Sequence, residues 1–241
     1  MTQSLSDKVI LVTGAAKRMG RGIALRLAKE GARVAIHYGG SEAEAQATAA
    51  ECGNAPIFQA DLEKVSDIER LFEQVESHFG RLDGLVNNAA RFTEIDPLKI
   101  TEKDWDFIHS VNLKATFFCN QHAAKAMLKT GGGRIINISS MGGLKGWPTH
   151  AHYSASKAGV IMLTRALSQA WAPQISVNSV APGVIPFEEK NEERIMKLVK
   201  QTPAGRAGTA EDISDAVVFF LTAPKFITGQ IMAVDGGLSQ R

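Results

Sequence analysis

The pair of residues best suited to proton transfer is Tyr153 and Lys157, which stand four positions apart. In a helix this spacing places both side chains on one face. A phenol titrates near 10, and a cation within about 4–6 Å lowers that pKa by roughly 1–3 units. Because a group with a pKa near the working pH is an effective general acid or base, the spacing predicts a proton-transfer site. The same spacing is common by chance in helices, so the prediction depends on the rest of the chain.

A second chemical signal is the segment Thr13-Gly14-Ala15-Ala16-Lys17-Arg18-Met19-Gly20, which follows an apolar run and precedes a helical pattern. The first glycine permits a tight turn and the last permits close packing of the helix on the sheet, so that backbone N–H groups face a phosphate. The spacing is not G-x-G-x-x-G, and an ordinary turn with two glycines is the alternative. The residues expected to bind the diphosphate of a dinucleotide are Gly14, Lys17, Arg18, Met19 and Gly20.

The second apolar run ends in His37-Tyr38-Gly39-Gly40-Ser41 and carries no Asp or Glu at its tip. An acidic residue there accepts hydrogen bonds from the ribose of NAD, so the usual partner of NAD is missing. The cations of Lys17 and Arg18 and the hydroxyl of Ser41 are suited to a 2′-phosphate. We therefore expect NADP(H), with His37, Tyr38 and Ser41 at this end of the site. The alternative is that Arg18 is only a solvated surface charge.

These residues must be positioned by a framework in which short apolar runs alternate with longer segments of helical period, a pattern typical of a parallel sheet built from β-α units. Strands are predicted at Val9–Val12, Val34–Tyr38, Ile57–Ala60, Leu85–Asn87, Arg134–Ile138, Ile175–Val180 and Ile231–Val234. Helices are predicted at Arg21–Glu30, Glu42–Cys52, Val65–Phe79, Asp104–Lys129, Tyr153–Ala170, Glu192–Gln201 and Ala210–Leu221.

No linker, repeat or low-complexity run interrupts this alternation over residues 1–241. The predicted fold is α/β, a single doubly wound Rossmann domain with a seven-stranded parallel sheet flanked by helices. Ligands of such sheets bind outside the carboxyl ends of the strands, where the strand order reverses. We expect the candidate residues to meet there.

The composition excludes several other classes of protein. The 27 Lys and Arg residues against 25 Asp and Glu give a net charge of +2, too small for a surface that holds a nucleic-acid backbone. The two cysteines are too few for a disulfide framework, and His150 and His152 lack neighbouring ligands for a metal. The apolar runs are too short for a secretory signal or a bilayer span. We expect a cytoplasmic protein with no metal and no nucleic-acid or membrane partner.

Further motifs follow the predicted strands in a fixed order. They are Asp61-Leu62, Asn87-Asn88-Ala89, Asn112, Ser140, Pro182-Gly183 and the ending Thr228-Gly229-Gln230 to Asp235-Gly236-Gly237. Together with the glycine turn and the Tyr153/Lys157 pair, they make the chain resemble the short-chain dehydrogenase/reductases over essentially its whole length.

The resemblance implies a catalytic role for four residues. Tyr153 would give a proton to the substrate oxygen as hydride arrives, while Lys157 lowers the pKa of Tyr153 and holds the nicotinamide ribose. Ser140 would orient the substrate carbonyl, and Asn112 would hold a water that links Lys157 to solvent. The neighbouring Ser139 would point to the opposite face of its strand. The resemblance also implies that Asp61 and Leu62 contact adenine and that Asn88 and Ala89 line the cofactor ribose. Ile185, which follows Pro182-Gly183, would meet the carboxamide through its backbone.

Departures from the family pattern bear on the substrate. Most members carry Gly where this chain has Arg18, and the string around Arg18 resembles the pteridine reductases. Phe92 matches the aromatic residue that sandwiches a pterin ring against nicotinamide in that branch. Ser140 opposes this interpretation, because those reductases carry Asp at the matching position. The sequence leaves open whether Arg91 contacts substrate.

The expected function is that of an NADPH-dependent oxidoreductase that reduces a carbonyl or C=N bond of a small substrate, either pteridine reductase-like or a general ketone reductase. Ser140, Phe92 and Tyr153 are expected at the substrate. The segment 184–201 would close over it, although its charged residues fit a solvated helix start better than specific substrate contacts. A catalytically silent module that binds the cofactor for regulation is the alternative, which the intact set of four catalytic residues opposes. The resemblance also implies a homotetramer with the segment 210–237 at a subunit contact.

Overall fold

The computed structural model describes residues 4–186 and 192–240 of the chain. Within them one sheet has seven strands, all parallel, in the order β3-β2-β1-β4-β5-β6-β7. The strands are β1 (Val9–Val12), β2 (Arg33–Tyr38), β3 (Ile57–Gln59), β4 (Gly84–Asn87), β5 (Gly133–Ile138), β6 (Ile175–Pro182) and β7 (Ile231–Val234). The predicted α/β fold with a seven-stranded parallel sheet is therefore confirmed.

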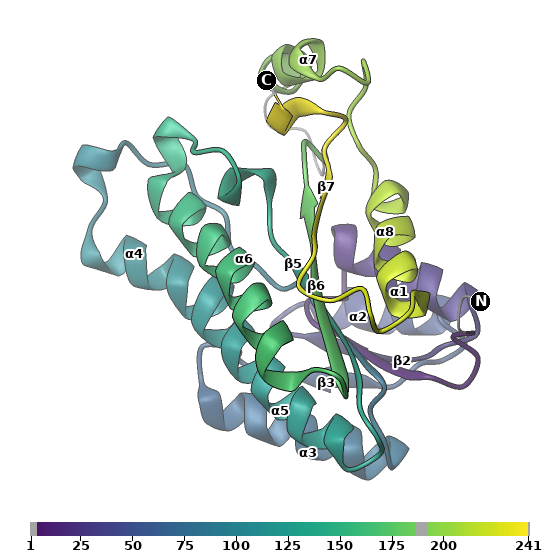
Figure 1. Ribbon diagram of the computed structural model, residues 1–241. Helices are drawn as coiled ribbons and strands as arrows, with labels where there is room; N and C mark the ends of the chain where they lie inside the picture. Colours follow the sequence, from purple (N-terminus) through teal and green to yellow (C-terminus); the bar gives the residue numbers. More distant parts are fainter. Residues whose placement is uncertain (1–3, 187–191, 241) are drawn as a thin grey trace.

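Helices cover both faces of the sheet (Figure 1). One face packs against α1, α2 and α8, and the other against α3, α5 and α6. The helices are α1 (Arg18–Lys29), α2 (Glu42–Glu51), α3 (Val65–Phe79), α4 (Glu102–His109), α5 (Thr116–Leu128), α6 (Ala151–Trp171), α7 (Glu192–Gln201) and α8 (Ala210–Thr222).

Strand β1 illustrates why consecutive apolar residues form the central strands. Ile10 and Val12 belong to the hydrophobic cluster on the side of α1 and α8, whereas Val9 and Leu11 belong to the cluster on the side of α3 and α5. Successive side chains of a strand point to opposite faces, so a strand covered on both sides needs apolar residues at every position.

The predicted helix Asp104–Lys129 was wrong as one element. Helix α4 begins two residues earlier, because the Thr101 side chain and Asp104 form a reciprocal capping box. The chain then makes a π-helical turn over Ser110–Ala115 before α5 begins. Asn112 lies in this turn, which fits the frequent occurrence of π-helical turns at functional sites.

The strand order reverses between β1 and β4. From β1 the chain builds the sheet outward through β2 and β3, and then returns to the other side of β1 with β4. A doubly wound sheet separates its loops at this point and leaves a crevice at the carboxyl ends of the strands.

Candidate active site

A cavity of about 980 Å³ lies at these carboxyl ends. That volume is at the upper end of the range for small-molecule and cofactor sites. The predicted residues that line it are Gly14, Lys17, Arg18, Met19, Gly20, His37, Asp61, Leu62, Asn88, Ala89, Phe92, Ser140, Tyr153, Lys157, Pro182, Gly183 and Ile185. The structure thus brings together residues from the ends of six strands.

Three predicted residues do not line the cavity. Tyr38 instead packs into the hydrophobic cluster beside α1 and α2, because it points to the face of β2 opposite to His37. Ser41 occupies the N-cap position of α2. Asn112 is fully buried behind the wall, where its amide binds the backbone of Arg91 and the hydroxyl of Ser156.

The glycine turn is as tight as its sequence indicates. Gly14 has a φ of 62°, in the left-handed region that favours glycine. A Cβ on Gly20 would lie 2.1 Å from the carbonyl oxygen of Gly14 and 2.5 Å from Asn88 Nδ2, so only glycine fits at this contact. Helix α1 begins at Arg18 with no acidic residue in its first turn, and its positive end faces the cavity wall that Lys17 and Arg18 form.

His37 supports this turn rather than standing free in the cavity. The backbone N–H of Gly14 donates to His37 Nδ1 over 3.0 Å, so Nε2 carries the proton and donates to the Ala60 carbonyl at 3.2 Å. Burial lowers the pKa of His37 to about 4, opposed by the bond to Ala60. A neutral imidazole therefore joins the ends of β1, β2 and β3.

Thr13 and Asn88 join the glycine turn to the end of β4. Thr13 Oγ1 accepts hydrogen bonds from the backbone N–H groups of Asn88 and Ala89, at 3.0 and 3.1 Å. Asn88 Nδ2 donates back to the carbonyls of Thr13 and Gly14, at 2.9 and 3.1 Å. The side chain of Asn88 is thereby committed to shaping the cavity floor, a role that its place after the strand did not reveal.

Helix α6 carries Tyr153 and Lys157 on its first two turns, and both side chains are buried. Lys157 Nζ donates to the carbonyl of Ile138 at 2.9 Å and lies 5.9 Å from the centre of the Tyr153 ring. Ser140 follows β5, and its Oγ accepts a hydrogen bond from Gly142 N. Ser139 is turned toward β6, since its hydroxyl donates to Val180 O and accepts from Ser179 Oγ.

Burial governs the protonation of this pair. It raises the pKa of Tyr153, while the hydrogen bond with Ser140 acts in the opposite direction. It lowers the pKa of Lys157 to about 8. The expected lowering of the Tyr153 pKa is therefore not seen, because Lys157 is bonded to Ile138 and removal from water disfavours the phenolate.

Aromatic side chains gather around Tyr153 at the mouth of the cavity. The Phe92 ring stands edge-on to the Tyr153 ring, with 4.8 Å between centres, and lies 4.6 Å from His150. Trp147 lies nearly parallel to Tyr153 at 6.4 Å. Phe92 is 54% exposed although it is a large apolar residue, so it is available to a ligand.

Sequence reasoning missed part of the wall. Ile195 and Leu198 line the cavity from α7, where their apolar character within a charged helix was the available signal. Glu188, Glu189 and Lys190, in the segment expected to close over substrate, lie outside the described residues. Within 4–186 and 192–240 no group of three His, Cys, Asp or Glu side chains could hold a metal ion. In the same ranges no helix has the length and apolar character to cross a bilayer.

Comparison with known proteins agrees with this geometry. The family model described as Enoyl-(Acyl carrier protein) reductase matches residues 14–239. The 3-oxoacyl-[acyl-carrier-protein] reductase of Staphylococcus aureus is 39% identical, with 96% of this chain and 98% of the relative covered. A short-chain type dehydrogenase/reductase of Picea abies is 37% identical, with 97% and 93% covered.

A solved structure agrees as well. A Sinorhizobium meliloti protein assigned as a short-chain alcohol dehydrogenase superposes with a TM-score of 0.92 at 35% identity, covering 98% of this chain and 97% of its own. The matches do not single out the pteridine-reductase branch. On its fold, its cavity and these relatives, the chain belongs to the short-chain dehydrogenase/reductase family of oxidoreductases.

Proposed function

We propose that the protein reduces a carbonyl group of a small substrate at the expense of NADPH. The observation that carries the proposal is the convergence of Ser140, Tyr153 and Lys157 on the same cavity as the glycine turn. Relatives that are 37–39% identical are named 3-oxoacyl-[acyl-carrier-protein] reductases, which act on a ketone. A regulatory module that only binds cofactor would not need all of these side chains.

The cavity residues fit a dinucleotide. The cavity reaches the glycine turn at the start of α1, whose first turn has no acidic residue, and the carboxylate beside this end is that of Glu44, 3.8 Å from Lys17 Nζ. Lys17 and Arg18 line the wall beside the end of β2, where neither His37 nor Gly39 offers a carboxylate to a ribose hydroxyl. This pattern supports NADP(H) over NAD, with Asp61 and Leu62 toward adenine and Asn88, Ala89, Pro182, Gly183 and Ile185 toward the ribose and nicotinamide.

The chain's own residues supply position and a proton. When bound, NADPH supplies the hydride that adds to the carbonyl carbon. Ser140 holds the carbonyl oxygen by its hydroxyl, and Tyr153 donates its phenolic proton to that oxygen as negative charge develops. The raised pKa of Tyr153 keeps the phenol protonated at neutral pH, as a proton donor requires. Lys157, charged below about pH 8, then stabilises the phenolate.

Asn112 acts from behind the wall in this proposal. Its side-chain amide accepts from the N–H of Arg91 at 2.7 Å and donates to the carbonyl of Arg91 at 2.9 Å. Its backbone carbonyl accepts from the hydroxyl of Thr116. Its Nδ2 also bonds Ser156 Oγ, which donates to the Tyr153 carbonyl. Asn112 therefore orients the turn of α6 that carries Tyr153, while the water link to Lys157 remains part of the proposal.

A second candidate substrate is a planar ring such as an oxidised pterin. The specific observation in its favour is the exposed Phe92 ring at the mouth, 4.8 Å from Tyr153. A flexible acyl chain gains less from stacking on an aromatic face than a planar ring does. Ser140 stands where the pteridine reductases carry a carboxyl group, which favours a ketone over a pterin as the substrate.

The experiment that separates these substrates is the initial rate of NADPH consumption with purified protein. The panel holds acetoacetyl-coenzyme A, cyclic ketones, oxidised pterins and dihydropterins, each with NADPH and with NADH. Carbonyl reduction predicts turnover of the thioester or ketones with NADPH. Faster pterin turnover would establish the second candidate, and no turnover in any arm would overturn the proposed activity.

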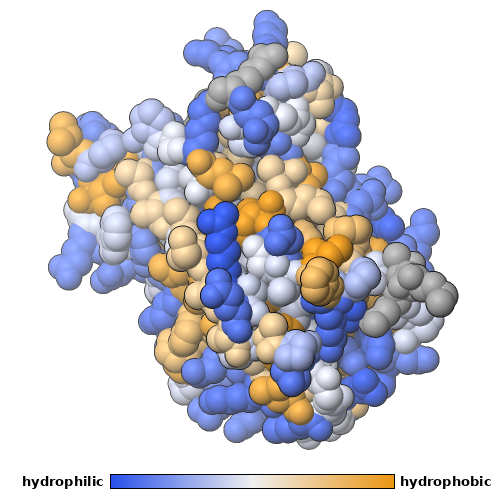
Figure 2. Space-filling model, in the orientation of Figure 1, coloured by the Kyte–Doolittle hydropathy of each residue, from blue (hydrophilic) through white to orange (hydrophobic). Residues whose placement is uncertain are grey.

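We further propose a homotetramer with the segment 210–237 at a subunit contact. Strand β7 is the edge of the sheet, and its four apolar residues are only half-buried. Figure 2 has apolar side chains in the middle of the face on which Figure 1 draws β7. Phe219 and Phe226 in the same segment are exposed. Analytical ultracentrifugation tests this assembly, and a monomer at micromolar concentration would contradict it.

A further inference from the structure

Arg91 lines the cavity beside Phe92, and its guanidinium is engaged by Glu63 and by helix α4. The group lies over the Phe107 ring of α4, 4.1 Å from its centre, and Nη1 donates to the Phe107 carbonyl at 3.1 Å. Its Nη2 forms an ion pair with the Glu63 carboxylate. Because these partners occupy the charged end, Arg91 is not placed to bind an anionic substrate.

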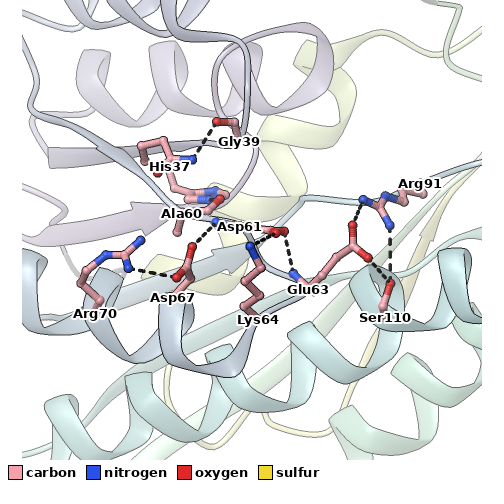
Figure 3. A network of polar contacts seen from close by, with 11 residues as sticks. His37, Gly39, Ala60, Asp61, Glu63, Lys64, Asp67, Arg70, Arg91 and Ser110 are labelled. Atoms are coloured by element: carbon pink, nitrogen blue, oxygen red, sulfur yellow. Dashed lines mark hydrogen bonds and ion pairs between the residues drawn. The ribbon is translucent and has the colours of Figure 1, made fainter.

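Glu63 connects this contact to the other side of the cavity. It follows Asp61 and Leu62, and its backbone N–H donates to Asp61 Oδ1 at 3.1 Å. Ser110, the first residue of the π-helical turn, has its hydroxyl 3.5 Å from both Glu63 Oε2 and Arg91 Nη1. Figure 3 shows the Glu63 carboxylate and the Arg91 guanidinium pointing toward each other, with Ser110 beside them.

Both the backbone and the guanidinium of Arg91 are thus held by neighbouring residues. Its backbone is held by the Asn112 amide, and its side chain by Glu63, Phe107 and Ser110. The next residue, Phe92, contacts Tyr153 and His150 on one side of its ring but is half exposed, so its position also depends on the backbone that Arg91 fixes. The side chain of Arg91 is only 26% exposed, so the ion pair and the cation–π contact are stronger than those of a fully solvated pair.

We propose that Arg91 is a positioning residue for substrate, which holds the Phe92 wall through its contacts with Glu63 and α4. The inference rests on the proposed function, because substrate is taken to bind beside Phe92 and Tyr153. The cofactor side has anchors of its own: Asp67 Oδ2 accepts from the N–H of Asp61, and Lys64 N donates to the Asp61 carbonyl. Loss of the Arg91 side chain therefore weakens substrate binding more than cofactor binding.

The central variant is Arg91→Met, which keeps an unbranched apolar stem in place of the arginine methylenes and removes the charge and the donors. Its matched control is Arg81→Met, since Arg81 makes a two-bond contact with Asp83 at 2.9 and 2.6 Å at the opposite end of β4. Arg91→Lys, Glu63→Gln and the double variant Glu63→Gln/Arg91→Met complete the set. Kinetics use acetoacetyl-coenzyme A, and fluorescence titration gives the Kd of NADPH.

Arg91→Met is expected to raise the KM for acetoacetyl-coenzyme A about tenfold, within the range of measured couplings between contacting residues. The Kd of NADPH stays within about twofold, and Arg91→Lys recovers part of the KM. The double variant resembles Arg91→Met alone, because the two residues act through one contact. Equal kinetic parameters in Arg91→Met and Arg81→Met, or additive effects of Glu63→Gln and Arg91→Met, would overturn the proposal.

Hydrogen exchange provides a readout without turnover. The peptide that spans residues 86–95 is expected to exchange faster in Arg91→Met and Glu63→Gln than in wild type, and unchanged in Arg81→Met. If wild type reduces no carbonyl, the proposed function fails, and this comparison alone decides whether the side chain holds the segment. Exchange in Arg91→Met equal to that of wild type would overturn the inference.

Discussion

The ammonium group of Lys157 is bonded to the carbonyl of Ile138 and lies 5.9 Å from the centre of the Tyr153 ring. The cation is therefore anchored to β5, close enough to stabilise a phenolate at Tyr153 but not in a direct ion pair with it. In the resting protein the phenol keeps its proton, and in the proposed reaction the charge on Lys157 stabilises the phenolate once that proton leaves.

Tyr153→Phe removes the hydroxyl and keeps the ring that Phe92 contacts. Carbonyl reduction is expected to fall by about 10²–10⁴-fold, the usual contribution of a general acid. The Kd of NADPH, measured by fluorescence titration, stays within about twofold. Turnover close to that of wild type would remove Tyr153 from the mechanism.

The pH dependence of reduction reports on Lys157. Its pKa is lowered to about 8 by burial, so its charge is present below that pH and is lost above it. The expected kcat/KM for reduction is level near neutrality and declines above about pH 8, as measured with NADPH in constant-ionic-strength buffers. A rate that stays level to pH 10 would contradict this role.

Arg18→Ala tests the choice of cofactor. Loss of a charge-assisted hydrogen bond to a 2′-phosphate is expected to raise the Kd of NADPH by about 10–100-fold and to leave that of NADH within about twofold. Arg21→Ala on the same helix is the control, because Arg21 pairs with Glu51. Equal changes for both cofactors would assign Arg18 to the surface.

The lowered pKa of His37 predicts that the folded protein loses stability in acid. The unfolded chain protonates this imidazole near 6.5, whereas the native pKa is about 4, so the unfolded state binds more protons between these values. The free energy of unfolding therefore falls as the pH drops from about 6.5 to 4, by about 3 kcal/mol from this group. His37→Asn keeps an acceptor for Gly14 N and is expected to show a smaller fall in urea unfolding. Parallel profiles would refute the assignment.

The two cysteines are expected to be unreactive. Burial raises the pKa of Cys52 to about 11 and that of Cys119 to about 12, and thiolate is the reactive form. Mass spectrometry after brief treatment with iodoacetamide at pH 7.5 is expected to find little modification of the native protein and full modification in urea. Rapid native labelling of Cys119 would show that α5 opens readily.

Much of the fold was predictable because the central strands are covered on both faces. Their continuous apolar runs mark them, and the glycines and Pro-Gly steps mark their carboxyl ends. The residues that line the cavity were predictable for the same reason, since they follow those strands directly. This holds for Ser140 after β5 and for Asn88 after β4.

The break at Ser110–Ala115 was not predictable, because it depends on a contact distant in sequence. Asn112 bonds the backbone of Arg91, 21 positions away, and the helix accommodates this contact by a π-helical turn. Nor could the sequence predict that His37 lines the cavity while Tyr38 packs into the hydrophobic cluster. In a strand with two apolar faces the alternation does not reveal which face meets the glycine turn.

The two-sided burial of β1 has a consequence for its alignment in the sheet. A slip of one residue would exchange Val9 and Leu11 for Ile10 and Val12 at each face, and because all four are aliphatic, hydrophobic burial penalises the slip only weakly. Alignment must then come from polar contacts at the two ends of the strand. Asp83 Oδ2 accepts from Val9 N at one end, and Thr13 N donates to Val86 O at the other. These bonds help to fix where Gly14 falls, so the position of the glycine turn is linked to a carboxylate at the opposite, amino-terminal ends of the strands.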